Sequence, residues 1–504
     1  MPGTGLWRTK TVEQSIADTD EPDTKLRRNL TAWDLTVFGV AVVIGAGIFT
    51  LTARTAGDLA GPSVALAFVL AAIACALAAL CYAEFASTVP VAGSAYTFSY
   101  ATFGEFIAWI IGWDLVLEFA VGAAAVGKGW SAYLQVVLGY IFGSDVKTTA
   151  EVFGLTVDWG ALLLVVVLAW LLTMGTKLSS RVSLVITSIK VAIVLFVIFF
   201  GLSFVKSENY TPFIPDPATS GSTGSTGVDQ SLFSALAGGE SSAYGIFGLL
   251  AAASLVFFAF IGFDVVATTA EETRHPQRAV PRGILGSLAI VTVLYVGVSL
   301  VVVGMLPYQE LSTGEDGASK TLATAFSANG VDWAANVISI GALAGLTTVV
   351  MVLLLGQIRV LFAMSRDGLL PRGLAKTGPH GTPARATLLV TIMVGVAATF
   401  FEAGQLEEMV NVGTLFAFIL VSAGVMVLRK TRPDLPRGFR VPWVPVIPIL
   451  AILACLWLML NLTILTWLRF AGWMVLGVIV YFVYSRRNSL LGKRMKDDAD
   501  NSVS

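Results

Sequence analysis

Charged residues and cysteines are scarce in this chain. Asp, Glu, Lys and Arg make up only 13% of its 504 residues, whereas 56% of the residues are hydrophobic. A soluble domain needs a polar surface, so this composition excludes one and predicts a polytopic membrane protein. The three cysteines, Cys75, Cys81 and Cys455, all lie in apolar segments. Their setting favours packing as small hydrophobic residues over disulfides or metal ligands.

The motifs of enzymes and metal sites are missing as well. The two histidines are far apart in the sequence, and neither HExxH nor Gly-x-Ser-x-Gly occurs. Residues 122–129 resemble a phosphate-binding loop, but Gly129 stands where Ser or Thr is required and no strand precedes the segment. We therefore predict no enzymatic activity, no cofactor, no metal and no nucleic-acid partner. The sequence gives no indication of an accessory subunit.

Long apolar runs recur after a polar N-terminal tail. Residues 1–30 are predicted to be disordered, and they do not have the pattern of a cleavable signal. Each later run is long enough to cross about 30 Å of hydrocarbon. The sequence thus predicts an all-α polytopic membrane protein with about twelve transmembrane helices, near residues 33–56, 63–88, 104–130, 159–177, 182–205, 246–271, 283–306, 334–364, 386–402, 407–428, 445–467 and 470–485.

Lys and Arg are unevenly divided between the two predicted sides of the membrane. With the N-terminus inside, 25 of the 32 basic residues fall in cytoplasmic tails and loops. Since cytoplasmic loops are enriched in Lys and Arg, we expect both termini to be cytoplasmic. The transmembrane domain is then 31–486, and 487–504 is a cytoplasmic tail. The loop 206–245, which contains a Ser/Thr/Gly-rich run, is expected outside.

Two of the apolar spans contain residues that should interrupt a helix near the middle of the membrane. Gly45-Ala46-Gly47 lies in the first span, and Ile261-Gly-Phe-Asp264 lies in the sixth. Gly loosens a helix by about 1 kcal/mol relative to Ala, and a carboxylate at the bilayer centre costs about 2.5–3.5 kcal/mol. The first and sixth spans enter from opposite sides, as an inverted five-plus-five repeat requires. The repeats are expected over about 33–205 and 246–428, with extra helices over about 445–485.

A pair of interrupted spans is the best sequence indication of a transporter's binding site. At the Gly45–Gly47 break, backbone N–H groups lose their helical partners and suit a carboxylate. At the second break, around Ala259 to Ile261, freed carbonyl oxygens suit an ammonium group. Together the breaks are expected to hold both ends of an α-amino acid. The alternative interpretation is that these glycines only permit close helix packing.

Lys190 lies about two turns into the fifth span and is a candidate proton-coupling residue. Burial disfavours the charged form of a lysine, so the proton is released more readily. The alternative is a side chain that snorkels to the cytoplasmic interface. In the eighth span, Ala344, Thr347 and Thr348 share one helical face. Their hydroxyls beside Lys190 would form a site that resembles a sodium site, with ammonium in place of the metal.

Acidic residues within the spans have two interpretations. Asp114 and Glu118 are four residues apart and therefore share a face of the third span. They are either structural partners of a buried basic group, or a subsite for the cationic end of a substrate, or a partner for Lys190. Asp264, in the second break, is with Asp114 a candidate for pairing or gating.

Phe258 and Glu84 are two further residues with possible gating roles. Phe258 is the first choice for an aromatic side chain that lies over the substrate. Glu84 is at a predicted cytoplasmic end, where we expect interfacial water or a pair with Arg274, Arg278 or Arg282.

An ordered set of motifs resembles the amino acid–polyamine–organocation superfamily, and within it the cationic amino acid transporter branch. The likeness runs from about 30 to 486 and implies the five-plus-five fold with alternating access. It also implies that Lys190 stands in for the second sodium site of sodium-coupled relatives. One departure is Ala46, where many relatives carry Ser or Thr. The motifs are Gly45-Ala-Gly-Ile-Phe49, Tyr82-Ala-Glu-Phe85, Pro90-Val-Ala-Gly-Ser-Ala-Tyr96, Phe258-Ala-Phe-Ile-Gly-Phe-Asp264 with Ala270-Glu-Glu272, and Ser365-Arg-Asp-Gly-Leu-Leu-Pro371.

The expected function is secondary active transport of L-amino acids, cationic, small neutral or both, into the cell across the plasma membrane. Protons are the expected coupling ion, through Lys190 with Thr347 and Thr348, and the lipid bilayer is the expected environment. The alternatives are an amino acid or polyamine exchanger and a non-transporting nutrient sensor. The resemblance and the two breaks together give the expected substrate-binding residues, which are Val43, Gly45, Ala46, Gly47, Phe258, Ala259, Ile261 and Glu118.

Overall fold

The structure is a computed structural model that describes residues 30–45, 47–88, 94–143, 146–152, 155–174, 180–217, 227–237, 243–268, 273–313, 320–376, 382–493 and 495. Within these ranges, eight helices are long and apolar enough to cross a membrane, and three shorter apolar helices accompany them. One of the eight, the apolar stretch 32–88, is interrupted after Val43, and its second long helix begins at Val64. The longest uninterrupted helix among them is Glu105–Phe142, with 38 residues. The protein is therefore an all-α, multi-pass membrane protein, whereas the number of twelve spans and the inverted repeat stay predictions.

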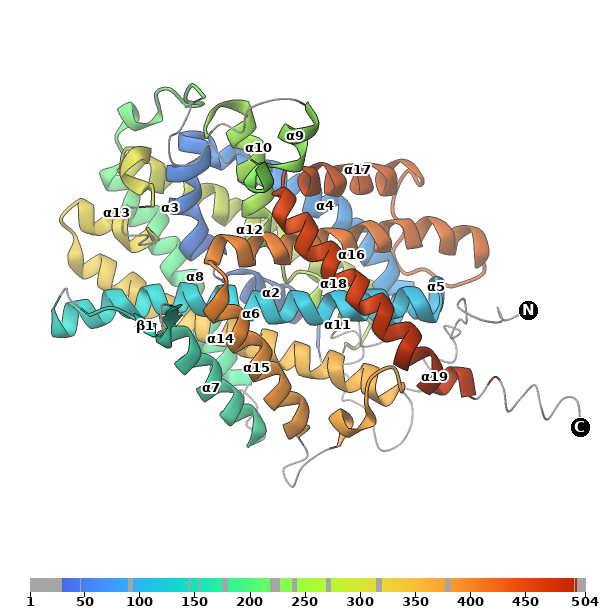
Figure 1. The fold of residues 1–504 in the computed structure, drawn as a ribbon. Coiled ribbons are helices and arrows are strands. Elements are labelled where there is room, and N and C mark those ends of the chain that lie inside the picture. Colours follow the sequence, from blue (N-terminus) through green and yellow to red (C-terminus); the bar gives the residue numbers. More distant parts are fainter. Residues whose placement is uncertain are drawn as a thin grey trace, which may run out of the picture.

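Helices of the first half begin close to the predicted spans (Figure 1). A small antiparallel hairpin, β1 (Thr149–Val152) and β2 (Leu155–Asp158), follows the longest helix and pairs Thr149 with Asp158. The helical elements are α2 (Ala32–Val43), η1 (Gly47–Leu51), α3 (Thr52–Thr55), η2 (Ala56–Ala60), η3 (Gly61–Ser63), α4 (Val64–Thr88), α5 (Ser94–Thr102), α6 (Glu105–Phe142), α7 (Trp159–Thr173), α8 (Ser180–Gly201), η4 (Leu202–Phe204) and η5 (Ser207–Tyr210).

The second half contains another interrupted span and the C-terminal helices. Its elements are η6 (Gly227–Asp229), α9 (Leu232–Ala237), α10 (Gly245–Val256), η7 (Phe257–Phe260), α11 (Val265–Thr268), α12 (Pro276–Met305), η9 (Tyr308–Leu311), α13 (Leu322–Ala328), α14 (Asp332–Arg366), η10 (Arg372–Ala375), α15 (Ala384–Phe400), α16 (Ala403–Thr431), α17 (Val446–Leu460), α18 (Ile464–Val480), η11 (Tyr481–Ser485) and α19 (Arg486–Asn488).

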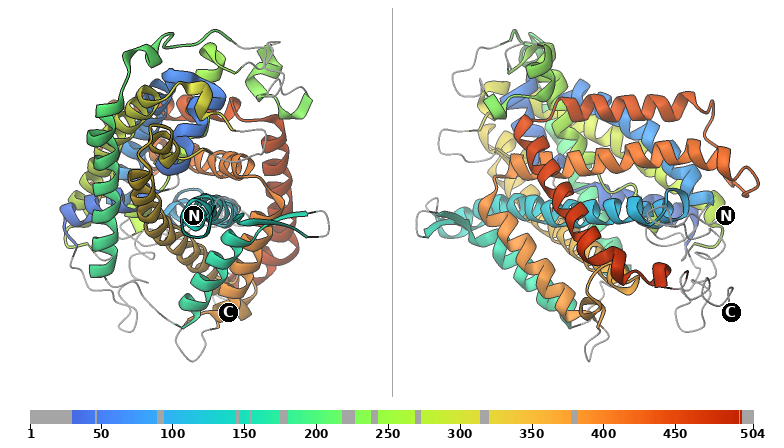
Figure 2. Two further views of the ribbon diagram at one scale, coloured as in Figure 1. Left: turned by 90° about the vertical axis from the view of Figure 1, so that its left-hand side faces the viewer. Right: turned by 45° about the vertical axis from the view of Figure 1, so that its right-hand side comes forward.

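Helix α6 runs through the middle of the bundle and is seen end-on in the left panel of Figure 2. It packs most extensively against α14 and α16. The helix has 38 residues, about 57 Å, and continues well beyond the predicted end of the span at 130. Its last residues, Tyr140, Ile141 and Phe142, are largely exposed. The sequence did not predict this extension.

Two details differ from the sequence-based expectations. The boundary between the last two spans lies at 461–463 and not at 467–470, because Thr463 caps α18 through its side chain, which accepts from the amide of Thr466.

Glu84 is bound to other partners than the sequence predicts. Its carboxylate accepts from Arg429 and from the amide of Val441, and it lies 3.4 Å from Arg437, so the expected partners Arg274, Arg278 and Arg282 are wrong.

Candidate functional site

The first interruption falls inside the first span. Helix α2 ends at Val43, and Ile44 has an extended backbone with φ −67° and ψ 95°. The chain becomes helical again at Gly47 with the π-helical turn η1 and continues through α3 and η2 to Ala60. The first amide groups of this second helical stretch have no acceptors within it, and that of Phe49 donates back to the carbonyl of Gly45 at 3.5 Å. Ala46 lies outside the described residues.

The second interruption falls inside the span that begins with α10. The α-helix ends at Val256, tightens into the 3-10 turn η7 and leaves helical geometry at Ile261, which has φ −63° and ψ 137°. Gly262 follows with a φ of +115°, a conformation that residues with a side chain rarely adopt. Helix α11 then begins at Val265.

The two interrupted segments cross each other in close contact. A Cβ atom built on Gly47 would overlap the Cα and Cβ atoms of Ala259, and one built on Gly262 would lie 2.8 Å from a methyl group of Val42. Residue 47 therefore faces 259 while residue 42 faces 262, so the segments pass in opposite directions. This antiparallel crossing agrees with spans that enter from opposite sides of the membrane.

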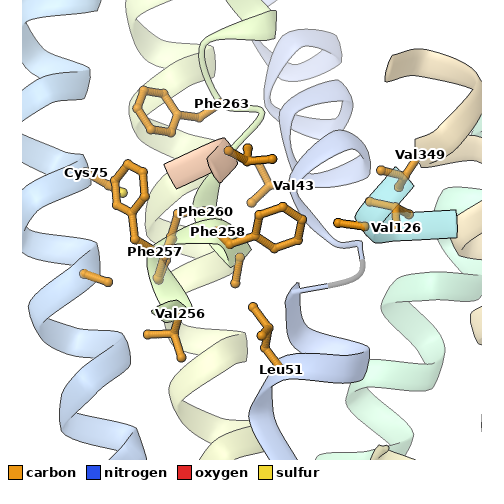
Figure 3. Packing of buried hydrophobic residues seen from close by; sticks show 14 of the residues in the cluster. Val43, Leu51, Cys75, Val126, Val256, Phe257, Phe258, Phe260, Phe263 and Val349 are labelled. Atoms are coloured by element: carbon orange, nitrogen blue, oxygen red, sulfur yellow. The ribbon is translucent and has the colours of Figure 1, made fainter. Parts of the chain in front are cut away.

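A pocket lies at this crossing. Both interruptions contribute to its wall, and the remaining walls come from α6, α14 and α16. Figure 3 shows Phe258 on the side of Val126 and Val349, whereas Phe257 points toward Cys75 of α4. The residues that line the pocket are Val42, Val43, Gly45, Gly47, Glu118, Phe119, Gly122, Val126, Phe258, Ile261, Gly262, Asp264, Val265, Val349, Val352, Leu353 and Val410.

Most of the predicted substrate-binding residues lie at this pocket. Ala259 is not among the lining residues. It is buried, and its backbone packs directly against Gly47. The residues that the structure does bring together are Val43, Gly45, Gly47, Phe258, Ile261 and Glu118.

The ionisable side chains among the described lining residues of the pocket are acidic. Glu118 and Asp264 both line it, and no Lys or Arg is among its lining residues. Asp114 is fully buried one turn away on α6, where its carboxyl group lies against Gly413 of α16. Within the described residues, neither oxygen of Asp114 has a hydrogen-bond partner. The predicted pairing of Asp114 or Glu118 with Lys190 is not among the ion pairs of that part of the chain.

Lys190 of α8 is buried inside the protein. Only 2% of the residue is exposed, and its Nζ donates to the carbonyl oxygen of Ala41 at 3.0 Å. Ala41 lies in the last turn of α2, where carbonyl groups lose their helical partners and attract a cation. The lysine stem packs against Gly345 of α14. This arrangement couples the charge of Lys190 to the end of the first broken helix.

The two threonines predicted beside Lys190 have bonds of their own. Thr348 donates to the carbonyl of Gly345 at 2.7 Å. Thr347 donates to Leu343 and accepts from the indole of Trp130 at 3.0 Å. Thr347 thus serves the contact between α6 and α14.

Sequence reasoning missed several polar side chains that hold the broken backbones. Tyr295 of α12 donates to the carbonyl of Val43 at 2.7 Å, and Tyr133 of α6 donates to the carbonyl of Phe49 at 2.6 Å. Asn411 of α16 donates to the carbonyls of Ser254 and Leu255 at 2.7 and 3.3 Å. Their location inside apolar spans was a usable signal, because polar groups there are costly and commonly functional.

Two interrupted membrane helices that share one pocket define the broken-helix class of membrane transport proteins. A comparison of the sequence with models of protein families identifies the family. The sequence model of the amino acid permease family matches residues 30–484, and the chain belongs to this family.

Characterised relatives extend over almost the whole chain. The branched-chain amino acid permease BcaP of Bacillus subtilis is 43% identical over 499 residues, which are 97% of this chain and 99% of that protein. The methylthioribose transporter of the same organism is 41% identical over 493 residues, again 97% and 99%. The vacuolar cationic amino acid transporter 4 of Arabidopsis thaliana is 36% identical over 433 residues, 85% of this chain and 68% of that protein.

Proposed function

We propose that this permease is a secondary active transporter that imports L-amino acids together with protons across the plasma membrane. The transport domain would be 31–486, with both tails in the cytoplasm. The observation that carries the proposal is the pocket, whose wall includes the backbones of both interrupted spans. A zwitterion has one charge for each type of exposed backbone group, N–H at the first break and C=O at the second.

The composition of the pocket supports amino acids with apolar or cationic side chains. Valine, leucine and phenylalanine side chains form most of the wall, which suits an aliphatic substrate. Glu118 and Asp264 suit the amino group or a second cationic group, since no basic side chain of the lining competes with it. The printed names of the relatives include both branched-chain and cationic amino acids. One relative is named for methylthioribose, a sugar, so this compound belongs in any substrate panel.

Proton coupling is proposed through Lys190. As an ammonium group it makes a charge-assisted hydrogen bond to Ala41, and such bonds are about twice as strong as neutral ones. Loss of the proton would weaken the hold on the end of α2, which lies at the substrate pocket. Protonation and the shape of the binding site are therefore linked through one contact.

Uptake by the purified protein in proteoliposomes tests this proposal. Labelled L-arginine, L-leucine and L-alanine are offered with the outside buffer acidic or equal to the lumen. We expect accumulation of at least one of them, several-fold faster with the acidic exterior, because inward proton flow then drives the cycle.

Two results would contradict the proposal in different ways. Uptake that occurs only into vesicles preloaded with amino acid would identify an exchanger. Binding without any uptake would favour a sensor.

A further inference from the structure

We propose that Asn411 is a positioning residue that holds the second broken helix, as Lys190 holds the first. The inference rests on the proposed transport function, because its test measures the binding and uptake of an amino acid. Asn411 is fully buried in α16, and its Nδ2 donates to the carbonyl oxygens of Ser254 at 2.7 Å and Leu255 at 3.3 Å. Both carbonyls belong to the last turn of α10, at the point where the α-helix gives way to η7.

The two contacts occupy equivalent places. Lys190 donates to Ala41, which is two residues before the last residue of α2. Asn411 donates to Ser254, which is two residues before the last residue of α10. In the predicted inverted repeat, α8 and α16 are the fifth spans of the two halves, and α2 and α10 begin the first spans. In each half, the fifth span thus places a nitrogen donor on the same turn of the broken first span.

The two donors differ in whether they can release a proton. An amide does not titrate in the physiological range, so Asn411 holds its helix end at every pH, whereas an ammonium group can release its proton. The amide acts through its donor end, because in the described part of the chain its Oδ1 has no hydrogen-bond partner. Asn411 does not line the pocket, but its neighbour Val410 does. Its effect on the substrate would therefore pass through the backbone of Phe257–Phe260, which follows α10 directly.

The test compares Asn411→Leu with Asn411→Gln in the full-length protein. Leu removes the donor, and Gln keeps an amide on a longer stem. The probe is whichever of L-arginine, L-leucine and L-alanine the wild type binds best, and both its Kd and its uptake KM and Vmax are measured on monodisperse protein. We expect Asn411→Leu to raise Kd and KM by roughly tenfold, the factor that one such bond is worth if its loss is fully transmitted to the pocket. We expect Asn411→Gln to stay within roughly threefold of wild type. Ser422→Ala, a buried change three turns further along α16, is the control and should leave KM unchanged.

The outcomes separate a positioning role from a packing role. If Asn411 only filled space, apolar Leu would be tolerated at least as well as Gln, and a loss of folded protein would lower Vmax without a change in KM. Either of these results overturns the inference while leaving the proposed function intact. Failure of the wild type to bind any of the three amino acids overturns the proposed function and the inference with it.

Discussion

Replacing Gly47 by alanine is expected to weaken substrate binding by roughly ten- to hundredfold. The added methyl group would occupy the position of the Ala259 backbone, and neither backbone can move aside without changing the wall of the pocket. Overpacking of this kind costs about 1–3 kcal/mol, and each 1.4 kcal/mol is a factor of ten in an equilibrium constant. Titration of the purified variant with a labelled amino acid gives the Kd directly.

The matched control for this variant is Gly472→Ala. Gly472 lies in α18, and an added Cβ there would meet nothing within 4 Å. Alanine is the better helix former by about 1 kcal/mol, so this variant should bind as the wild type does and be no less stable. If Gly47→Ala bound its substrate with wild-type affinity, the two broken segments would not cross as described.

Replacing Lys190 by alanine is expected to abolish the stimulation of uptake by an acidic exterior. The variant lacks the ammonium group that binds the carbonyl of Ala41, and no titratable group remains at this position. A residual uptake rate that is the same with and without the gradient is the predicted result. Lys190→Arg separates charge from titration, because arginine stays charged at all relevant pH values. It should retain binding and still lose the response to the gradient.

Lys128→Met provides the control for charge removal. Lys128 lies within α6 and is half-buried, and it is not among the residues that line the pocket. The variant should keep a several-fold stimulation by external acid. Undiminished stimulation in Lys190→Ala itself would refute coupling through this lysine and direct attention to Glu118 and Asp264, which line the pocket.

Local features of the sequence were sufficient to predict the class of fold and the two interruptions. Glycine at positions 45, 47 and 262 has its effect on the backbone where it stands, so its consequences can be predicted from the sequence alone. The structure adds why two of these positions need glycine. Gly262 has a positive φ, and Gly47 leaves room for the backbone of Ala259.

Contacts between distant segments could not be predicted in the same way. Glu84 binds Arg429, which is 345 residues further along the chain, and nothing in either local sequence favours that arginine over Arg274. Tyr295 and Asn411 were recognisable as polar residues in apolar spans, but their acceptors depend on which helices pack together. The hydroxyl partners of Thr347, Trp130 and Leu343, likewise depend on which helices pack together.

Competition by end-modified substrate analogues tests the central claim most directly. If the amide groups at the start of η1 and the carbonyl groups at the second interruption bind the two ends of an amino acid, removal of either charged end should remove a charge-assisted hydrogen bond of about 1.5–3 kcal/mol. We predict that the decarboxylated amine and the deaminated acid of the best substrate compete at least tenfold more weakly than the amino acid itself. Equal competition by either analogue, or by methylthioribose, would contradict the claim that this pocket recognises a zwitterion.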